Sequence, residues 1–224
     1  MAEKENIIEF RQAGVPAIPP LFAELREVDF AAREGELVFI IDSTPDGQMP
    51  LGDLAEGLIA PEQGSVWIKG RDWKDVPPTE AASLRGRIGR VFENRGWLSN
   101  LDMDENITLV QRHFTGRPQA DIEAKALALA LAYGLPDLPR VRPAFMKKTE
   151  LRRAEWIRAF LGNPLLIILE QPLRDVYPEH WKNLAAAVQA ARARGTAIIW
   201  IDDDEAVLRA EKNLDPEIFL RRNG

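Results

Sequence analysis

Two apolar runs near the end of the chain constrain its fold more than any other feature. Residues 165–169 read LLIIL and residues 196–201 read TAIIWI, so an extended chain would carry apolar side chains on both faces. Such strands are typical of parallel sheets, which helices cover on either side. Residues 178–193 favour a helix between the runs, and Gly195 follows as a stop signal. Strand, helix and strand with short links form a βαβ unit, which predicts an α/β protein.

The rest of the chain divides into a β-rich first part and a helical central part. Helical spacing and the stop at Gly134 predict a helix over 119–133, and another helix begins near Thr149. At 224 residues and 46% hydrophobic content, the chain is long enough for one substantial core. We therefore expect a single domain over residues 1–224, with a helical part at about 95–162. Short runs of strand-forming residues occur at 7–10, 25–30, 37–41, 66–68 and 88–92.

The composition excludes several classes of function. A net charge of -6 and a pI near 5.2 argue against a nucleic-acid partner, because phosphate contacts need clustered Lys and Arg. The chain has no cysteine and two histidines, which excludes disulfides, thiol nucleophiles and Cys-rich or His-rich metal sites. The opening MAEKENIIEF lacks the apolar core of a signal peptide, and no stretch approaches the roughly 18 apolar residues that span a bilayer. We expect a soluble protein whose membrane role, if any, comes through a partner.

Polar residues gather where the predicted buried strands end. Asp42 follows one strand, Glu170 and Gln171 follow the second, and residues 202–204 (DDD) follow the third. In doubly wound folds, ligands bind in the crevice outside the carboxyl ends of the strands. These positions are therefore candidate site residues. The alternative is that acidic residues only end buried strands at the surface.

The segment around Asp42 has the layout of a phosphate-binding loop. The apolar strand ELVFII runs into a short polar loop and then into a helix-like stretch, in IIDSTPDGQMPLGDLAEGL. Phosphate loops follow G-x-x-x-x-G-K-[ST]: glycines and free N–H groups cradle phosphates, the Lys reaches the β- and γ-phosphates, and the hydroxyl holds Mg²⁺. Here the layout is present, whereas most of the binding residues are not.

The order and spacing of several stretches together resemble the nucleotide-binding subunit of an ABC transporter. The resemblance covers about residues 6–222 and implies an ABC ATPase-like α/β fold. It implies a mixed β subdomain, a parallel-sheet core of the phosphate-loop type and an α-helical subdomain. The matching stretches are LGDLAEGLIAPEQGSVWIKGRDW after the phosphate loop, RGRIGRVFENRGWLSNLDMDENITL at the Q-loop, TELRRAEWIRAFLGNPLLIILEQP at the signature helix and Walker B strand, AIIWIDDDEA at the switch strand and DPEIFLRRNG at the closing strand.

At its phosphate loop the sequence departs from this family's pattern. Asp42 replaces the first Gly, Gln48 replaces the Lys and Met49 replaces the Ser or Thr, while Gly47 is retained. A carboxylate about 4 Å from a phosphate adds up to about 4 kcal/mol of repulsion at an effective dielectric near 20. Losing the lysine removes a charged contact of roughly 1.5 to 3 kcal/mol. We expect phosphate binding to be weakened by several orders of magnitude.

The remaining motifs also lack the residues that the family uses to bind and hydrolyse ATP. The Q-loop glutamine is Glu93, the D-loop aspartate is Tyr177 and the switch histidine is Asp202. In the Walker B strand, Glu170 stands for the magnesium-associated Asp and Gln171 for the catalytic Glu; an amide cannot accept the proton of an attacking water. In the signature L-S-G-G-Q, the replacements are Met146, Lys147, Lys148, Thr149 and Glu150.

These departures predict a catalytically degenerate ABC subunit, a pseudo-ATPase that keeps the fold as a scaffold or regulatory partner of a membrane permease. No functional catalytic residue, metal or cofactor is expected. One alternative is a divergent ATPase that still binds ATP and Mg²⁺ and powers transport. Another is a free-standing interaction module that kept only the fold.

The resemblance also implies partners. It predicts an integral membrane permease, a homodimer or a heterodimer with another ABC subunit, and a cytoplasmic location peripheral to the inner or plasma membrane. The segment ENRGWLSNLDMDENITL is most similar to the ABC subunits of MCE-associated lipid transporters. This similarity implies a lipid permease as the partner. Trp is common among binding hot spots, so we expect a permease to dock near Trp97; the alternative is that Trp97 packs into its own domain. The docking candidates are Trp97, Leu98, Leu101 and Met103.

Two charged clusters have a second interpretation. The basic residues at 147, 148, 152 and 153 suit phosphate or acidic lipid heads, or else a solvated helix start. The acidic residues at 202–205, with Glu170, suit a cation site by ligand type, or else a helix N-terminus favoured by its dipole.

Overall fold

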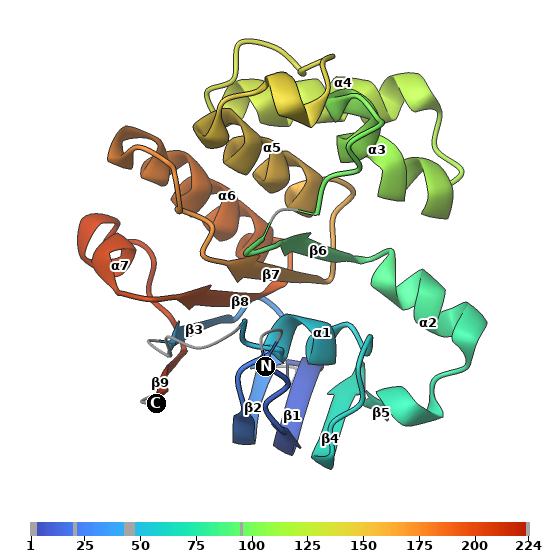
Figure 1. Ribbon diagram of the computed structural model, residues 1–224, viewed down its shortest axis with the longest axis vertical. Helices are drawn as coiled ribbons and strands as arrows, with labels where there is room; N and C mark the ends of the chain where they lie inside the picture. Colours follow the sequence, from blue (N-terminus) through green and yellow to red (C-terminus); the bar gives the residue numbers. More distant parts are fainter. Residues whose placement is uncertain (1–3, 20–21, 43–47, 95, 223–224) are drawn as a thin grey trace.

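The computed structural model describes residues 4–19, 22–42, 48–94 and 96–222, and the strands in this part form two sheets (Figure 1). One sheet has the order β2-β1-β4-β5, and the other has the order β6-β7-β8-β3-β9. The first comprises β1 (Asn6–Val15), β2 (Leu25–Arg33), β4 (Gln63–Ile68) and β5 (Arg71–Asp72). The second comprises β3 (Leu37–Asp42), β6 (Ile88–Val91), β7 (Leu166–Glu170), β8 (Ala197–Asp202) and β9 (Ile218–Arg222).

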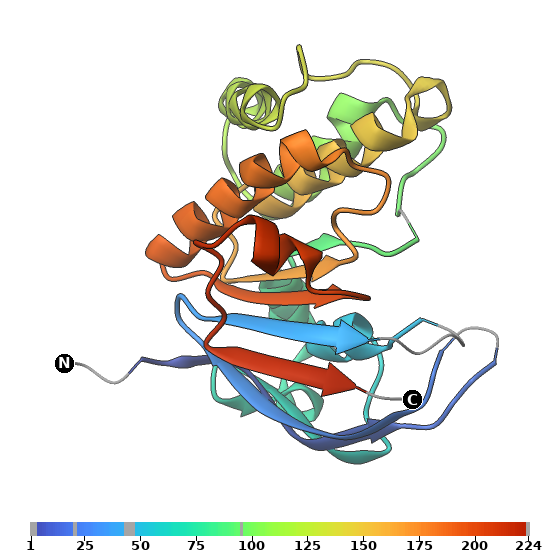
Figure 2. The same cartoon turned by 90° about the vertical axis from the view of Figure 1, so that its left-hand side faces the viewer.

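The second sheet is parallel at every pairing, as the two apolar runs predict. β3 lies between β8 and β9, as Figure 2 shows, and β7 lies between β6 and β8. Along β3 the side chains alternate between two cores: Phe39 packs on the helical side, while Ile40 packs toward the antiparallel sheet. Because both faces are covered, the strand shows no polar alternation. The predicted α/β class with a parallel core, an antiparallel sheet and a helical part is confirmed.

Helices α3, α4 and α5 pack together at the top of Figure 1, beyond the parallel sheet. Trp156 of α5 and Trp200 of β8 are fully buried in the core between these helices and the sheet. Packing therefore accounts for these two tryptophans. The helices are α1 (Leu51–Ala55), α2 (Pro78–Arg85), α3 (Met103–Phe114), α4 (Gln119–Ala132), α5 (Lys148–Phe160), α6 (Trp181–Ala193) and α7 (Ala206–Ala210), with 3₁₀ turns η1 (Trp73–Asp75), η2 (Pro143–Phe145) and η3 (Pro178–His180).

Several element boundaries differ from the predicted ones. The first strand runs to Val15 instead of residue 10, because its pairing with β2 and β4 continues across bulges that apolar spacing does not reveal. The helix predicted from residue 178 begins as the 3₁₀ turn η3, since Pro178 opens the segment, and becomes α-helical at Trp181. Within the part of the chain described, no helix is both long and apolar enough to cross a membrane.

Candidate functional site

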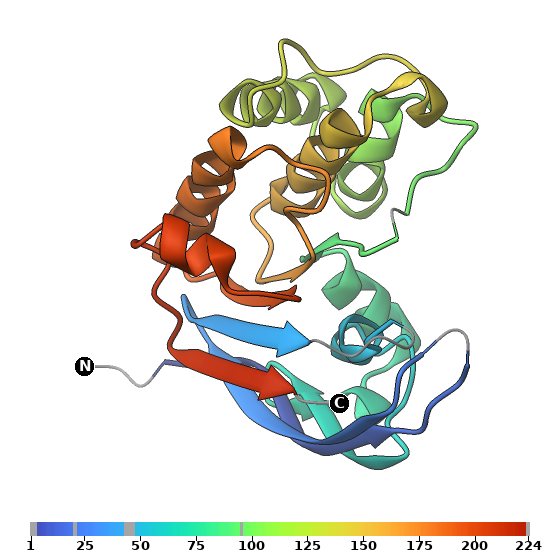
Figure 3. The same cartoon turned by 60° about the vertical axis from the view of Figure 1, so that its left-hand side comes forward.

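The candidate site lies at the carboxyl ends of β3, β7 and β8, which point the same way (Figure 3). Because these strands are neighbours in the sheet, the polar residues that follow them meet. They surround a hollow of about 50 Å³, a small volume beside the roughly 300 to 1,000 Å³ of most ligand pockets. The hollow is lined by Asp42, Met49, Glu93, Glu170, Gln171, Ile201 and Asp202.

A buried arginine on β6 occupies the interior behind this hollow. Arg90 Nη2 donates to Glu170 Oε1 at 2.7 Å, and Nη1 donates to Asp53 Oδ1 at 2.6 Å and Glu56 Oε2 at 2.7 Å. The Arg90 side chain is 2% exposed, and its guanidinium lies 4.5 Å from the centre of the Phe92 ring. One cation therefore ties β6 to β7 and to helix α1, which follows the predicted phosphate loop.

Both carboxylate oxygens of Glu170 have partners. Oε1 accepts from Arg90, and Oε2 accepts from the backbone N–H of Glu93 at 3.1 Å. Helix α1 approaches the pair closely because residue 52 is glycine: a Cβ there would lie 2.3 Å from Glu170 Oε1 and 2.5 Å from Arg90 Nη2. Both oxygens of the Glu170 carboxylate therefore accept hydrogen bonds from within the protein.

In this cluster, burial and the neighbouring opposite charges shift the pKa values of the side chains in opposite directions. Burial raises the pKa of Glu170 and that of Glu56, and the Arg90 guanidinium opposes both shifts. Burial disfavours the charged form of Arg90, but the carboxylates of Glu170 and Glu56 outweigh it and raise the pKa of Arg90. Arg90 therefore stays cationic and serves as the counter-ion of the cluster.

Two other acids of the hollow also have arginine partners. Arg222 Nη1 of β9 lies 3.5 Å from Asp42 Oδ2, and Arg174 Nη2, after β7, lies 3.2 Å from Glu93 Oε1. Gln171, between Glu170 and Arg174, adopts a left-handed backbone with φ 43°. Its N–H donates to the Ile201 carbonyl at 2.8 Å, which holds this turn against β8.

Asp202 differs from these acids because no cation contacts it in the part of the chain described. Trp200 Nε1 and the Asp203 N–H each donate to its carboxylate at 3.0 Å. Burial is the main cause that raises the pKa of Asp202 to about 7, and these two hydrogen bonds act in the opposite direction. This carboxyl is therefore partly protonated at neutral pH.

The other predicted site residues do not all join the hollow. Gly47 lies outside the described residues, Gln48 is half-buried, and its carbonyl accepts from the Ala23 N–H at 3.1 Å. Tyr177 is 63% exposed after β7. Residues 146–150 lie in the link between α4 and α5 and in the first turn of α5, away from the hollow's lining.

The basic cluster predicted at 147–153 divides into two parts. Lys147 and Lys148 are exposed, whereas Arg152 and Arg153 are 1% and 6% exposed. Arg152 donates to the carbonyls of Phe92 and Glu93, and Arg153 donates to those of Tyr133 and Gly134. Both interpretations of the cluster are therefore wrong for Arg152 and Arg153, because their side chains are buried and their guanidinium groups donate to backbone carbonyls.

The cation-site interpretation of the acidic run also lacks structural support. In the described ranges, no group of three or more His, Cys, Asp or Glu side chains is arranged to hold a metal ion. Asp204 instead accepts from the Ala206 N–H at 2.6 Å, at the start of α7. A local turn thus accounts for part of this run.

The predicted docking residues differ in exposure. Leu98 is 48% exposed, whereas Met103 is fully buried in the core, so we do not retain Met103 as a docking residue. Trp97 is half-buried against the core, and the Arg158 guanidinium lies 4.3 Å from the centre of its ring. Leu101 is also half-buried.

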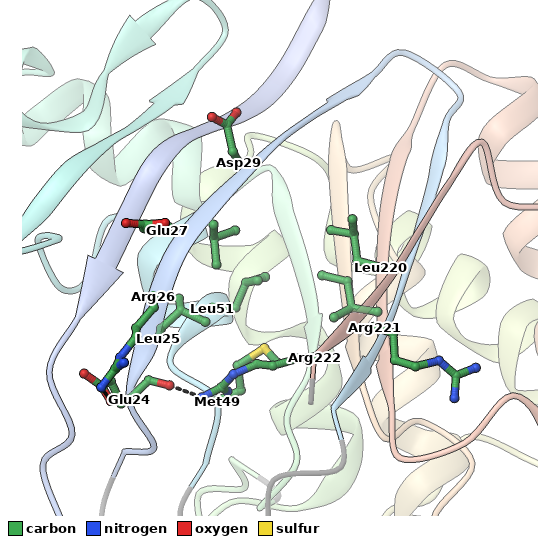
Figure 4. Close-up of a pocket in the computed structure, with 12 residues that line it drawn as sticks. Glu24, Leu25, Arg26, Glu27, Asp29, Met49, Leu51, Leu220, Arg221 and Arg222 are labelled. Carbon is green, nitrogen blue, oxygen red and sulfur yellow. Dashed lines mark hydrogen bonds and ion pairs between the residues drawn. The ribbon is translucent and has the colours of Figure 1, made fainter. Parts of the chain in front are cut away.

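Two larger hollows lie outside the candidate site. A hollow of about 560 Å³ lies beside β6, α2 and α3 and is lined by five arginines, Arg85, Arg87, Arg90, Arg117 and Arg158. Another, of about 640 Å³, lies between β2 and β9, with an apolar floor that includes Leu25, Leu51 and Leu220 (Figure 4). Arg222 crosses the end of this second hollow and donates to the Glu24 carbonyl.

Comparison with known proteins assigns the fold to a family. The family model for ABC transporters matches residues 25–174, which run from β2 through β7. The chain belongs to the ABC transporter family. Its fold also agrees with the solved dimeric structure of MJ0796, a bacterial ABC transporter cassette, with TM-score 0.80, 19% identity and coverage of 96% of this chain and 94% of that one.

Sequence relatives of this ABC family member are ATP-binding proteins. It is 30% identical to the lipoprotein-releasing system ATP-binding protein LolD 1 of Chlorobium luteolum, over 85% of this chain and 83% of the relative. It is 28% identical to the methionine import ATP-binding protein MetN of Mesorhizobium japonicum, over 82% of this chain and 50% of the relative. The chain thus spans about half the length of MetN and most of LolD 1.

Sequence reasoning placed Asp42, Glu170 and Asp202 together but missed Arg90, Asp53 and Glu56. The available signal was an arginine inside an otherwise apolar strand, IGRV, because a charge in a buried strand needs a partner. Asp53 and Glu56 are three residues apart at α1 and present carboxylates on one face. In this ABC family member they are the remaining partners of that arginine.

Proposed function

We propose that this chain is a catalytically degenerate ABC subunit that serves as a scaffold or regulatory partner of a membrane permease. The observation that carries the proposal is the pairing of Arg90 with Glu170. Glu170 occupies the position at which the family's Walker B carboxylate associates with magnesium, and here an internal guanidinium neutralises it. A Mg²⁺–nucleotide complex would have to displace Arg90 or share the carboxylate with it.

The charge at the strand ends supports the same proposal. Asp42, Glu93 and Asp202 line the hollow together with Glu170. Arginines already pair with three of these acids, Asp42, Glu93 and Glu170, and are not free to bind a phosphate. Asp202, when it is ionised, would add repulsion of up to about 4 kcal/mol to a phosphate about 4 Å away, at an effective dielectric near 20. Gln48 supplies no cation to offset it. The described residues therefore do not fit a magnesium nucleotide, and we derive no hydrolytic step through one.

Calorimetric titration of the purified chain with ATP, with and without Mg²⁺ and up to millimolar nucleotide, tests this proposal. We expect no saturable heat. Asp42→Ala serves as a companion variant, because removal of one repulsive carboxylate should strengthen any residual phosphate binding. Saturable binding by the natural chain with a Kd below about 0.1 mM, or roughly 5.5 kcal/mol, would overturn the proposal.

The partner in this proposal is an integral membrane permease, with the chain on the cytoplasmic side. The half-buried Trp97 ring lies 4.3 Å from the guanidinium of Arg158, which lines the hollow of about 560 Å³. Arg158 Nη2 is buried there without a hydrogen-bond partner among the described residues, and the neighbouring Leu98 is 48% exposed. LolD 1 belongs to a lipoprotein-releasing system, and a macrolide export protein, MacB of Agrobacterium fabrum, is 25% identical over 86% of this chain. We propose a lipid or lipid-linked substrate for the permease. Co-purification of a tagged chain from solubilised membranes, with Leu98→Glu as the docking variant, tests the permease as partner.

A divergent ATPase is the second candidate, favoured by relatives whose names describe ATP-binding proteins. It predicts saturable nucleotide binding and turnover that depends on Gln171, at the position of the catalytic Glu, and on Asp42. Steady-state hydrolysis by the natural chain and by Gln171→Ala distinguishes the two candidates. Turnover that the substitution abolishes would favour the ATPase. A free-standing module would instead co-purify with a soluble protein.

A further inference from the structure

The helical part of the chain ends in an exposed surface that is both apolar and basic. We call it the apical surface; it comprises the outward side of α4 from residue 124 and the link to α5 up to residue 148. It lies at one end of the longest axis of the molecule, at the top of Figures 1, 2 and 3. Its exposed apolar side chains are Leu127 at 37%, Leu131 at 55%, Val141 at 44% and Phe145 at 79%.

The link is anchored at both ends, so its exposed side chains are held outward. Leu138 is buried in the core beneath the helices, and Met146 packs against the same core. Between them, the Val141 carbonyl accepts from the Met103 N–H, at the start of α3, at 3.0 Å. The turn η2 then leaves Phe145 in solvent while the next residue turns inward. The exposure of Val141 and Phe145 is therefore a feature of the folded link.

The apical surface is positively charged, although the chain as a whole has a net charge of -6. Residues 138–149, LPRVRPAFMKKT, contain four cations and no acid, and residues 124–132, AKALALALA, contain one cation and no acid. In the part of the chain described, none of the four cations in the link has an ion-pair partner. These exposed cations are Arg140, Arg142, Lys147 and Lys148.

The acids nearest to these cations along the chain bind backbone N–H groups. On one side, Asp137 Oδ1 accepts from the Leu138 N–H at 2.7 Å. On the other side, Glu150 Oε2 accepts from the Lys147 N–H at 3.2 Å, at the start of α5. The ammonium and guanidinium groups of the link therefore remain available to an anionic surface.

The position of the apical surface favours a flat partner over a peptide. The two largest hollows described above lie elsewhere, between β2 and β9 and beside β6. A protein segment usually docks in a groove or along a sheet edge, whereas this surface is an end of the molecule. Apolar side chains interspersed with cations suit the interface of an anionic bilayer, where the apolar groups meet the acyl boundary and the cations meet the headgroup phosphates.

We propose that the apical surface binds an anionic bilayer directly and reversibly. Charge and apolar contact act together here, and stable attachment to a membrane generally requires two such signals. This inference goes beyond the proposed function, in which the permease brings the chain to the membrane. It is tested with the purified chain alone, so vesicle binding and the absence of ATP binding can fail independently of each other.

Co-sedimentation of the full chain with vesicles tests the proposal. The vesicles contain equal parts of phosphatidylcholine and phosphatidylglycerol, and vesicles of phosphatidylcholine alone are the comparison. We expect binding at about 0.1 M NaCl that is at least about tenfold stronger on the anionic vesicles. It should be lost at about 1 M NaCl, where the screening length falls from about 10 Å to about 3 Å.

Charge reversal locates the binding surface. Lys147→Glu with Lys148→Glu should weaken vesicle binding by roughly 25-fold or more, because each cation near an anionic leaflet contributes a factor of about five. Arg194→Glu with Lys212→Glu is the control, since it makes the same charge change on exposed residues at the amino ends of β8 and β9 and should leave binding within about twofold of the charge-matched expectation for a remote site.

The apolar contribution is tested at Phe145. Phe145→Ser should weaken vesicle binding by roughly tenfold, because the ring no longer leaves water on binding. Leu58→Ser, at a residue that is 55% exposed after α1, is the matched control and should have no effect.

A fluorescent label shows which surface meets the lipid. The chain has no cysteine, so Ala144→Cys, beside Phe145, gives a single site for a nitrobenzoxadiazole label. We expect its emission to brighten and shift to shorter wavelength on anionic vesicles. The same label on Leu58→Cys should show neither change.

Three results would overturn the proposal. The natural chain could fail to bind anionic vesicles, its binding could survive both the charge reversal and Phe145→Ser, or the two labels could respond equally. Absence of vesicle binding, together with loss of the co-purifying permease in Lys147→Glu with Lys148→Glu, would assign the apical surface to a protein partner instead.

Discussion

Arg90 and Glu170 lie on adjacent parallel strands, and Arg90 Nη2 donates to Glu170 Oε1 at 2.7 Å with both side chains almost fully buried. The contact replaces an open carboxylate at the end of β7 with an internal ion pair. Asp53 and Glu56 extend the pair to helix α1. The edge of the sheet at which a nucleotide phosphate would be expected is therefore held together by protein charges.

Arg90→Met should destabilise the protein by about 3 to 5 kcal/mol, because it leaves three carboxylates around a site that has lost its cation. Urea unfolding measures the free energy. The loss should be smaller at pH 5 than at pH 8, because protons can replace the missing positive charge at lower pH. Arg87→Met, at an exposed position three residues earlier, is the control and should change the free energy by less than about 0.5 kcal/mol. Equal losses in the two variants would show that the buried pairing contributes nothing specific.

Gly52→Ala tests how closely α1 approaches the ion pair. The added Cβ would lie 2.3 Å from Glu170 Oε1, and that oxygen cannot retreat without lengthening its bond to Arg90. We expect a loss of about 1 to 3 kcal/mol, typical of overpacking. Gly116→Ala is the matched control, because a Cβ there meets no atom within 4 Å. Thermal unfolding of both variants measures the difference, and a neutral Gly52→Ala would contradict the observed close approach.

Asn106→Ala should loosen the segment that carries Trp97 and Leu98. Asn106 Nδ2 donates to the carbonyls of Leu98 and Leu101, at 3.0 and 3.1 Å, and Oδ1 accepts from the Leu98 N–H at 2.9 Å. Losing these contacts leaves partly buried backbone groups unpaired, so we expect a loss of about 1 to 3 kcal/mol.

Hydrogen exchange of residues 97–101 should quicken in the Asn106→Ala variant by more than global destabilisation explains. Asn100→Ala, at an exposed position of the same segment, is the control. If exchange quickens uniformly over the whole chain, Asn106 stabilises the fold in general and not this segment in particular.

The parallel core was predictable because a strand that is buried on both faces appears in the sequence as a continuous apolar run. Apart from the acid that ends each strand, the residues of β7 and β8 are apolar on both faces, and the order of strands and helices then limits the topology to an α/β fold. The meeting of Asp42, Glu170 and Asp202 followed from the same logic, since neighbouring parallel strands end at one edge. The resemblance to ABC subunits supplied the family, which the family model for ABC transporters confirms.

The partners of the site acids were not predictable from periodicity. Arg90 contacts Glu170 across 80 positions of sequence, and Arg222 contacts Asp42 across 180. Only the strand order, with β6 beside β7 and β9 beside β3, brings these charges together. The burial of Arg152 and Arg153 was missed for a related reason: a run of cations at a helix start resembles a solvated surface until the rest of the chain covers it.

Asp202→Asn should stabilise the protein, and by more at pH 8 than at pH 4. Burial raises the pKa of Asp202 from 3.8 to about 7, so the native state resists ionisation of this carboxyl. Between about pH 4 and pH 7 the unfolded chain has already lost this proton and the native chain has not, so stability falls as pH rises through this window. Above pH 7 both states are charged and the penalty is constant, at most about 4 kcal/mol.

Asparagine can still accept from Trp200 Nε1 and carries no charge, so the variant avoids the penalty. We expect a gain of about 1 to 3 kcal/mol at pH 8, after partial solvation of the carboxylate is considered, and a gain near zero at pH 4. Thermal unfolding at the two pH values measures this difference, with Asp215→Asn at an exposed position as the control. A gain of equal size at both pH values would mean that Asn improves packing or hydrogen bonding at this position. It would also mean that burial does not disfavour the charge of Asp202.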